Sequence, residues 1–235
     1  PSFEHLESQL GSSSTLVDRA LDELTADHVR RVQPSVVGLT VPFPDNVYGA
    51  FRIAKTIRAL SPAVRIVLGG GYVNTELRSL NDPRVFDYVD FITFDDGEKP
   101  LLCLLEHIAG TVTTDHLLRT LVRENGRVVF KNDPSTRDVP HRETGTPSYA
   151  GLSLGQYVST FRILNPMPRM STDGRWNKLT LAHGCYWKQC TFCDVSLDYI
   201  GRYDPASADV LIDRIETLMR ETGQSGFHFV DEAAP

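Results

Sequence analysis

The sequence predicts an α/β fold, in which a doubly wound, Rossmann-like parallel sheet precedes a second region that opens with a strand, a helix and a strand. Nearly continuous apolar runs of strand length recur at 35–41, 64–68 and 88–94, which is typical of parallel strands buried on both faces. Segments with apolar residues at helical spacing alternate with these runs. A further apolar run, 179–182, leads directly into a loop with three cysteines.

The first predicted helix covers 15–32. Thr15 and Asp18 have the spacing of a capping box, and Pro34 ends the helix before the strand at 35–41. One face of this helix is apolar and comprises Val17, Ala20, Leu21 and Leu24.

The next elements repeat the strand, turn and helix order. A proline-rich turn at 42–46 leads to a helix that ends near Leu60, and the strand at 64–68 ends in three glycines. The strand at 88–94 ends in an acidic turn and is followed by a helix over 100–109, since a proline suits the first helical turn. Ligands of such sheets bind outside the carboxyl ends of the strands.

The region after these elements predicts a hairpin and a linker. Asn125-Gly126, between two short apolar runs, is a strong hairpin signal. The following segment is rich in Pro, Ser, Thr and Gly, and Arg162, Arg169 and Arg175 in it could meet an anionic group. The predicted boundaries are 1–132 for the first domain with its hairpin, 133–176 for the linker and 177–235 for the second region.

Composition excludes several classes of protein. The chain has 235 residues, 41% of them hydrophobic, and a net charge of -6, so it lacks the basic surface that nucleic-acid binding requires. Its apolar runs are far shorter than the ~18 residues of a membrane span. Because the chain has no signal-like segment and starts at Pro1, we expect a cytoplasmic piece of a longer protein.

The cysteine loop is the strongest functional signal. Cys185, Cys190 and Cys193 have the spacing Cys-x4-Cys-x2-Cys, and thiolates so close on one loop can ligate one inorganic centre. An iron–sulfur cluster with one open position and a Cys3His zinc site that includes His183 both fit this pattern. The fourth cysteine, Cys103, lies in an apolar helix, where a thiol behaves as a small buried hydrophobe.

This loop and its surroundings resemble the opening of a radical S-adenosylmethionine (SAM) enzyme. The resemblance implies that the three cysteines hold a [4Fe-4S] cluster, that Phe192 lies near the SAM adenine, and that Asp231 and Glu232 bind the SAM amino group. The chemistry implied is reductive cleavage of SAM to a 5'-deoxyadenosyl radical. The usual spacing is Cys-x3-Cys-x2-Cys, so this chain has one additional residue.

The first domain resembles the cobalamin-binding domain that many radical SAM enzymes carry. The resemblance implies that three segments surround the corrinoid: Thr40-Val41-Pro42, Gly69-Gly70-Gly71 and the turn with Gly97-Glu98. No Asp-x-His-x-x-Gly motif is present to supply a histidine to cobalt. Taken without the resemblance, the glycines are turn residues. If cobalamin is bound, the implied chemistry is methyl transfer. If it is not bound, other radical rearrangements are equally compatible with the resemblance.

The alternative function is a non-catalytic binding or docking module with a Cys3His zinc site. Disulfide exchange by Cys190 and Cys193 is a second rival, but the loop lacks the thioredoxin-like setting. The second region holds only the start of a (β/α) barrel, which predicts an amino-terminal fragment that is itself inactive. An unpaired barrel edge would favour self-association. The substrate stays unknown, because its contacts would lie in the rest of the barrel.

Overall fold

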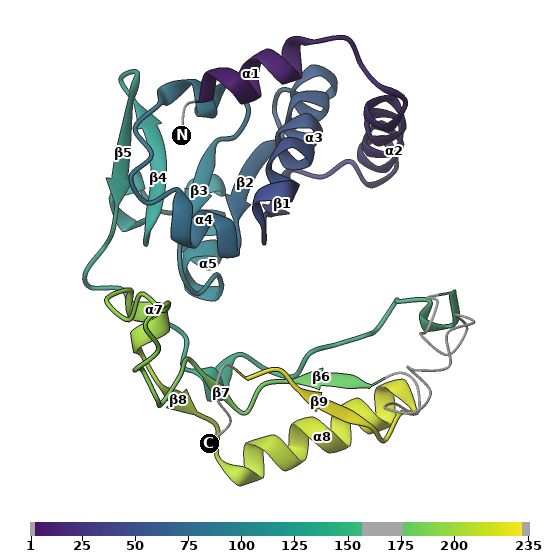
Figure 1. The fold of residues 1–235 in the computed structure, drawn as a ribbon, viewed down its shortest axis with the longest axis vertical. Helices are drawn as coiled ribbons and strands as arrows, with labels where there is room; N and C mark the ends of the chain where they lie inside the picture. Colours follow the sequence, from purple (N-terminus) through teal and green to yellow (C-terminus); the bar gives the residue numbers. More distant parts are fainter. Residues whose placement is uncertain (1–2, 157–175, 232–235) are drawn as a thin grey trace. The chain divides into compact units, whose positions relative to one another are not determined.

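The computed structural model of the chain describes residues 3–156 and 176–231 (Figure 1). The chain divides into two compact units, residues 1–138 and residues 139–235. The first unit contains a five-stranded sheet, and the second contains two strand pairs. In the described part of the chain, no helix has the length and apolar character needed to cross a membrane.

Two helices precede the first sheet. The sequence did not predict α1 (Phe3–Gly11), which buries Leu10 in the core. The predicted helix is α2 (Leu16–Val32). Its capping box is confirmed, because the Asp18 backbone N–H donates to Thr15 Oγ1 (3.2 Å) and the Asp18 carboxylate accepts from the Thr15 backbone N–H (2.8 Å). This exchange satisfies two donors that a helix start leaves unpaired.

The first sheet is mixed and dominated by its parallel part, with the strand order β1-β2-β3-β4-β5. The first three strands are parallel, so that Thr40 pairs with Gly69 and their carboxyl ends lie at one edge. The predicted hairpin is confirmed, with Asn125 and Gly126 at positive φ in its turn. The strands are β1 (Val36–Thr40), β2 (Arg65–Gly69), β3 (Phe91–Thr93), β4 (Thr120–Glu124) and β5 (Arg127–Lys131).

Helices cover both faces of this sheet, which confirms the predicted doubly wound α/β fold. Ile66 and Leu68 pack with α1, α3 and α4 in one apolar core, whereas Val67 points to the opposite face and packs with Leu104 of α5. The connecting helices are α3 (Val47–Leu60), α4 (Gly71–Glu76) and α5 (Glu98–Ile108), with the 3-10 turns η1 (Pro44–Asn46), η2 (Pro83–Asp87) and η3 (Thr114–His116).

Strand β3 is shorter than the apolar run 88–94 suggested. The backbone N–H groups of Tyr88 and Val89 both donate to the carbonyl of Val85, so they continue the turn of η2 and do not enter the sheet. Val89 is nevertheless fully buried. The apolar run therefore reflects burial of this segment more faithfully than it reflects strand pairing.

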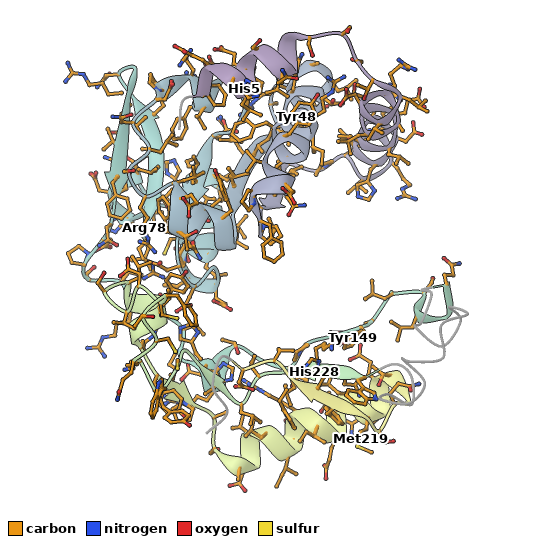
Figure 2. All side chains as sticks on the ribbon, viewed as in Figure 1. His5, Tyr48, Arg78, Tyr149, Met219 and His228 are labelled. Atoms are coloured by element: carbon orange, nitrogen blue, oxygen red, sulfur yellow. The ribbon has the colours of Figure 1, made fainter. Side chains whose placement is uncertain are left out.

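An ionic network joins α2 to α3. The Arg52 guanidinium, whose side chain is only 6% exposed, donates two hydrogen bonds to Asp22 at 2.9 and 2.6 Å. Thr56 also donates to Asp22, and the Tyr48 hydroxyl donates to Asp18 (Figure 2). The Arg52 hydrogen bonds hold the pKa of Asp22 below its ordinary value. A nearly buried cation is tolerated here because its donors are paired.

This network corrects the expected orientation of α2. The predicted apolar face is largely exposed, with Val17 75% and Leu24 69% accessible, while Asp18 is buried. Asp18 and Asp22 lie one helical turn apart and both face α3. Because the partners of these carboxylates are on α3, polar contacts act together with the buried Ala26 and Val29 to set the rotation of α2.

The second unit contains the predicted strand, helix and strand. Strands β6 (Asn177–Leu179) and β9 (Phe227–Phe229) pair in parallel, and α8 (Ala208–Thr222) connects them. Figure 1 shows α8 running along one side of this pair. Gly223 ends α8 in the left-handed conformation, as its sequence position predicted. The short elements of this unit are η4 (His141–Glu143), η5 (Leu154–Gln156), β7 (Ala182–His183), α7 (Asp198–Gly201) and β8 (Asp204–Pro205).

Part of the predicted linker packs within the second unit. The buried Arg214 of α8 donates to the His141 carbonyl at 2.7 Å, and the His141 backbone N–H donates to the Asp204 carboxylate. Burial, and secondarily the Arg214 charge, lowers the pKa of His141. The arginines at 162, 169 and 175 lie outside the described residues.

Asp22→Asn should lower the free energy of unfolding by about 3 kcal/mol, because it leaves the buried Arg52 guanidinium without its counter-charge. Chemical denaturation of the wild-type and variant chains measures the difference. Asp27→Asn is the matched control on the same helix, since Asp27 forms only an exposed pair with Arg30; it should leave stability nearly unchanged. Equal effects of the two substitutions would contradict this role of Asp22.

Candidate cofactor sites

The cysteine loop lies between β7 and α7 in the second unit. Cys185, Cys190 and Cys193 form no disulfide within the described residues, and all three are of intermediate exposure. Cys103, in contrast, is buried in α5 of the first unit, and burial raises the pKa of its thiol. The three loop cysteines therefore share one accessible segment, and the fourth is a core residue, as the sequence predicted.

Glycine is required at the start of the cysteine loop. Gly184 has φ +71, and a side-chain carbon there would overlap the carbonyl oxygen of Arg202. This close approach accompanies the pairing of β7 with β8, in which His183 lies opposite Asp204. The backbone just before Cys185 is thus fixed against the segment that follows the loop.

Local hydrogen bonds shape the rest of the loop. The Cys193 backbone N–H donates to the Cys190 carbonyl at 3.2 Å, and the Asp194 carboxylate accepts from the Ser196 backbone N–H and hydroxyl. Lys188 has φ +52, a left-handed conformation within the four-residue span between the first two cysteines. That span is one residue longer than the usual motif, and a left-handed residue is one way to close a lengthened turn.

Within the ranges that the structure describes, no three His, Cys, Asp or Glu side chains are gathered closely enough to hold a metal ion. The loop supplies thiols of the right chemistry for a cluster, but they are not drawn together. His183 Nε2 lies 2.9 Å from the Tyr199 carbonyl. Because a carbonyl oxygen only accepts, Nε2 carries the proton there, which disfavours this nitrogen as the fourth ligand of a Cys3His zinc site.

Asp231 follows β9 and reaches back to the segment before the cysteines. Its Oδ1 accepts hydrogen bonds from the backbone N–H groups of Leu181 and Ala182, at 2.8 and 2.9 Å. These bonds explain why the predicted strand 179–182 breaks between β6 and β7. The other oxygen, Oδ2, is buried and has no hydrogen-bond partner among the described atoms. A buried carboxylate oxygen without a donor is costly, and it suits a positively charged ligand group.

The remaining predicted SAM residues are less constrained. The Phe192 side chain is 86% exposed and lies on the outside of the loop. Glu232 lies outside the described residues. Two further exposed aromatic residues, Tyr186 and Trp187, follow the first cysteine, and the Tyr186 ring packs edge-on against Tyr203 at 6.0 Å.

In the first unit, the predicted corrinoid segments meet at the carboxyl edge of β1 and β2. Gly70 has φ +109, and a side-chain carbon there would lie 2.8 Å from backbone atoms of Val41. The equivalent atom on Gly71 would lie 3.1 Å from the Pro42 carbonyl oxygen. These glycines let the segments after β1 and β2 pack closely, which supports their interpretation as turn residues. Thr40 is exposed at the rim of this edge.

A charged network that the sequence did not reveal holds the third segment. The Asp95 carboxylate, 7% exposed, forms ion pairs with Arg78, in the turn after α4, and with Arg119. The Arg119 guanidinium also donates to the Asp96 carbonyl at 3.3 Å, and Asn74 Oδ1 accepts from the Asp95 backbone N–H at 2.8 Å. The turn that presents Gly97 and Glu98 is therefore braced from two sides. Its partners are distant in sequence, so no local pattern could have identified them.

An apolar cavity of about 460 Å³ opens beside the carboxyl ends of β1 and β2. Its walls come from α1, α3, α4 and the ends of β1 and β2, and include Phe3, Val41, Phe51 and Tyr72. A few polar groups, among them Asp82, line its margin. An apolar cavity with few polar groups at the carboxyl ends of parallel strands is the typical location for a ligand.

Comparison with known proteins gives methyltransferases among the sequence relatives. No family model matches the chain. It is 24% identical over 225 residues to an uncharacterized methyltransferase of Pyrococcus horikoshii, covering 92% of this chain and 44% of the relative. It is 22% identical over 220 residues to the cytidylyl-2-hydroxyethylphosphonate methyltransferase of Streptomyces wedmorensis, covering 85% of this chain and 40% of the relative. The chain thus spans less than half the length of these relatives.

The similar solved structures are radical SAM enzymes. The cobalamin-dependent S-adenosylmethionine radical enzyme OxsB, with aqua-cobalamin and S-adenosylmethionine bound, superposes with a TM-score of 0.65 at 18% identity, over 90% of this chain and 27% of OxsB. The radical S-adenosylmethionine methyltransferase TsrM from Kitasatospora setae gives a TM-score of 0.60 at 19% identity, over 90% of this chain and 39% of TsrM. At these identities the likeness shows the fold.

Gly70→Ala should destabilise the first unit by about 3 kcal/mol or more, because alanine at φ +109 is strained and its Cβ would collide with Val41. Thermal or denaturant unfolding measures the loss. Gly97→Ala is the control at the same edge, since Gly97 has φ -76 and open space at its Cβ position; it should change stability by less than about 0.5 kcal/mol. A Gly70→Ala protein as stable as the control would contradict the close-packing account.

Proposed function

We propose that this chain is part of a cobalamin-dependent radical SAM methyltransferase. The observation that carries the proposal is the juxtaposition in the second unit: Asp231, with one buried unpartnered oxygen, is hydrogen-bonded to the backbone that leads into the loop of three cysteines. The methyltransferase relatives and the cobalamin-dependent radical SAM folds support methyl transfer at a general level.

Each residue of the second unit has a distinct part in this proposal. Cys185, Cys190 and Cys193 would bind three irons of a [4Fe-4S] cluster and leave the fourth iron for SAM. When bound, the cluster supplies the electron that cleaves SAM reductively. The Asp231 Oδ2 would accept hydrogen bonds from the SAM ammonium group, which provides the missing donor. Phe192 would contact the adenine, and Glu232 would add a second carboxylate near the amino group.

The first unit would bind the cobalamin. The segments at its carboxyl edge, Thr40-Val41-Pro42, Gly69-Gly70-Gly71 and Gly97-Glu98, would contact the corrinoid, and the apolar cavity could take the aromatic base of the nucleotide tail. Arg78 and Arg119 would act as positioning residues, since they brace the Asp95–Asp96 backbone. The relatives act on different substrates by name, so the substrate of this protein is left open.

Alanine at any one of Cys185, Cys190 or Cys193 should abolish most of the iron and the visible cluster absorption after anaerobic reconstitution, because each thiolate holds one iron. Cys103→Ala is the matched control, since that thiol is buried in the other unit, and it should keep the wild-type iron content. Iron content equal in all four variants would contradict the proposed ligand set. A colourless wild-type chain with one zinc would favour the docking-module alternative.

Asp231→Asn should keep the cluster but weaken SAM binding by about tenfold or more, because the amide preserves an acceptor for the two backbone N–H groups and removes the charge facing the ammonium. The change in the reduced-cluster electron paramagnetic resonance signal on titration with SAM measures the affinity. An unchanged SAM response would rule out Asp231 as the SAM ligand, whereas loss of iron would assign it a structural role only.

A further inference from the structure

The open face of the β6–β9 pair carries a cationic group that none of the roles above uses. Side chains alternate between the two faces of a strand. Asn177 and Leu179 are buried, and the Asn177 amide donates to the Gln224 carbonyl just beyond α8. Lys178 therefore points to the other face, where it is exposed. His228 is its direct cross-strand partner and lies on the same face (Figure 2).

Lys178 and His228 are in contact and present only donors. The Lys178 ammonium lies 2.5 Å from His228 Nδ1. An ammonium group cannot accept a hydrogen bond, so Nδ1 accepts and the ring proton is on Nε2. The two remaining ammonium N–H groups and the imidazole Nε2–H are then left to donate. In the portions of the chain that the structure describes, the polar contact of Lys178 is with His228 and not with a carboxylate, although the protein carries more acidic than basic residues.

An aromatic ring flanks these donors. The Trp176 ring packs edge-on against His228, with centroids 6.3 Å apart and an interplanar angle of 77°. Gly226 makes room for this ring, because a side-chain carbon at that position would lie 2.6 Å from Trp176 Cδ1. Two neighbouring strands thus hold an imidazole and an ammonium group side by side, and the indole lies on the residue just before β6. Groups borne on strands are held more rigidly than groups on loops.

We propose that Lys178 and His228 bind an anionic oxygen group of the substrate, either a carboxylate or a phosphoryl or phosphonyl group, with Trp176 beside it. That the ligand is the substrate rests on the proposed function: in a (β/α) barrel the helices cover the outside, so the face opposite α8 is the inner face. Charge-assisted hydrogen bonds from an ammonium and an imidazole suit such a group. Its negative charge would also pair with the Lys178 ammonium, while the neutral imidazole donates from Nε2.

Nuclear magnetic resonance of the histidine rings tests this proposal without cluster or SAM. In the nitrogen-15-labelled chain, His228 should show the Nε2–H tautomer. Titration with methylphosphonate and, separately, with acetate should shift the His228 ring and Trp176 indole signals in a saturable way with at least one probe. The probe whose shifts saturate at the lower concentration identifies the class: methylphosphonate the phosphoryl or phosphonyl class, acetate the carboxylate class. The ring signals of His5, which lies in the other unit, serve as the internal reference.

Lys178→Gln should weaken that binding by about tenfold or more, whereas Arg220→Gln, which removes one exposed positive charge from α8, should leave it unchanged. Circular dichroism confirms folding of each variant, and His228→Gln provides a second test if Lys178→Gln fails to fold. Absence of a saturable shift with both probes, or equal shifts in Lys178→Gln, would overturn the proposal. Because the assay needs no cofactor, its result is independent of whether the cluster assembles.

Discussion

The hydrogen bonds of one carboxylate organise the second unit. Asp231 Oδ1 pairs the backbone N–H groups of Leu181 and Ala182 where the chain leaves β6, and buried donors without a partner would be costly. This pairing lies between β6 and β7, and the pairing of β7 with β8 then accompanies the close approach of Gly184 to Arg202. The cysteine loop therefore starts from a fixed backbone, and the other Asp231 oxygen is buried without a hydrogen-bond partner among the described atoms.

In the first unit, a glycine and a set of ion pairs fix the backbone beyond the parallel strands. At the carboxyl edge of its parallel strands, Gly70 allows the segment after β2 to touch Val41, and Asp95 holds the turn after β3 between two arginines. Both units thus fix the chain by polar or close backbone contacts just beyond parallel strands, which is where α/β proteins bind ligands. In the first unit, an apolar cavity opens beside the carboxyl ends of β1 and β2. The same principle of construction serves two different proposed cofactors.

Elements set by local sequence were predictable, and features set by distant contacts were not. Apolar runs predicted the parallel strands, the Thr15–Asp18 capping box predicted the start of α2, and Asn125-Gly126 predicted the hairpin. The rotation of α2 depends in part on Arg52, thirty residues beyond Asp22, so the apolar face expected for its first turns is largely exposed. The bracing of Asp95 by Arg78 and Arg119 likewise has no local signal. The motif indicated the three cysteines and Asp231, but not the hydrogen bonds that give Asp231 its structural part.

We propose that the two units bind two cofactors, and the metal and corrinoid content of the anaerobically reconstituted chain tests this most directly. After incubation with iron, sulfide and hydroxocobalamin followed by gel filtration, we predict four iron atoms, four sulfides and one cobalt per chain. Iron and sulfide without cobalt would contradict the part of the account that concerns the first unit. One zinc and no iron in the protein as purified, with no uptake of iron on reconstitution, would contradict the proposed iron–sulfur cluster in the second unit.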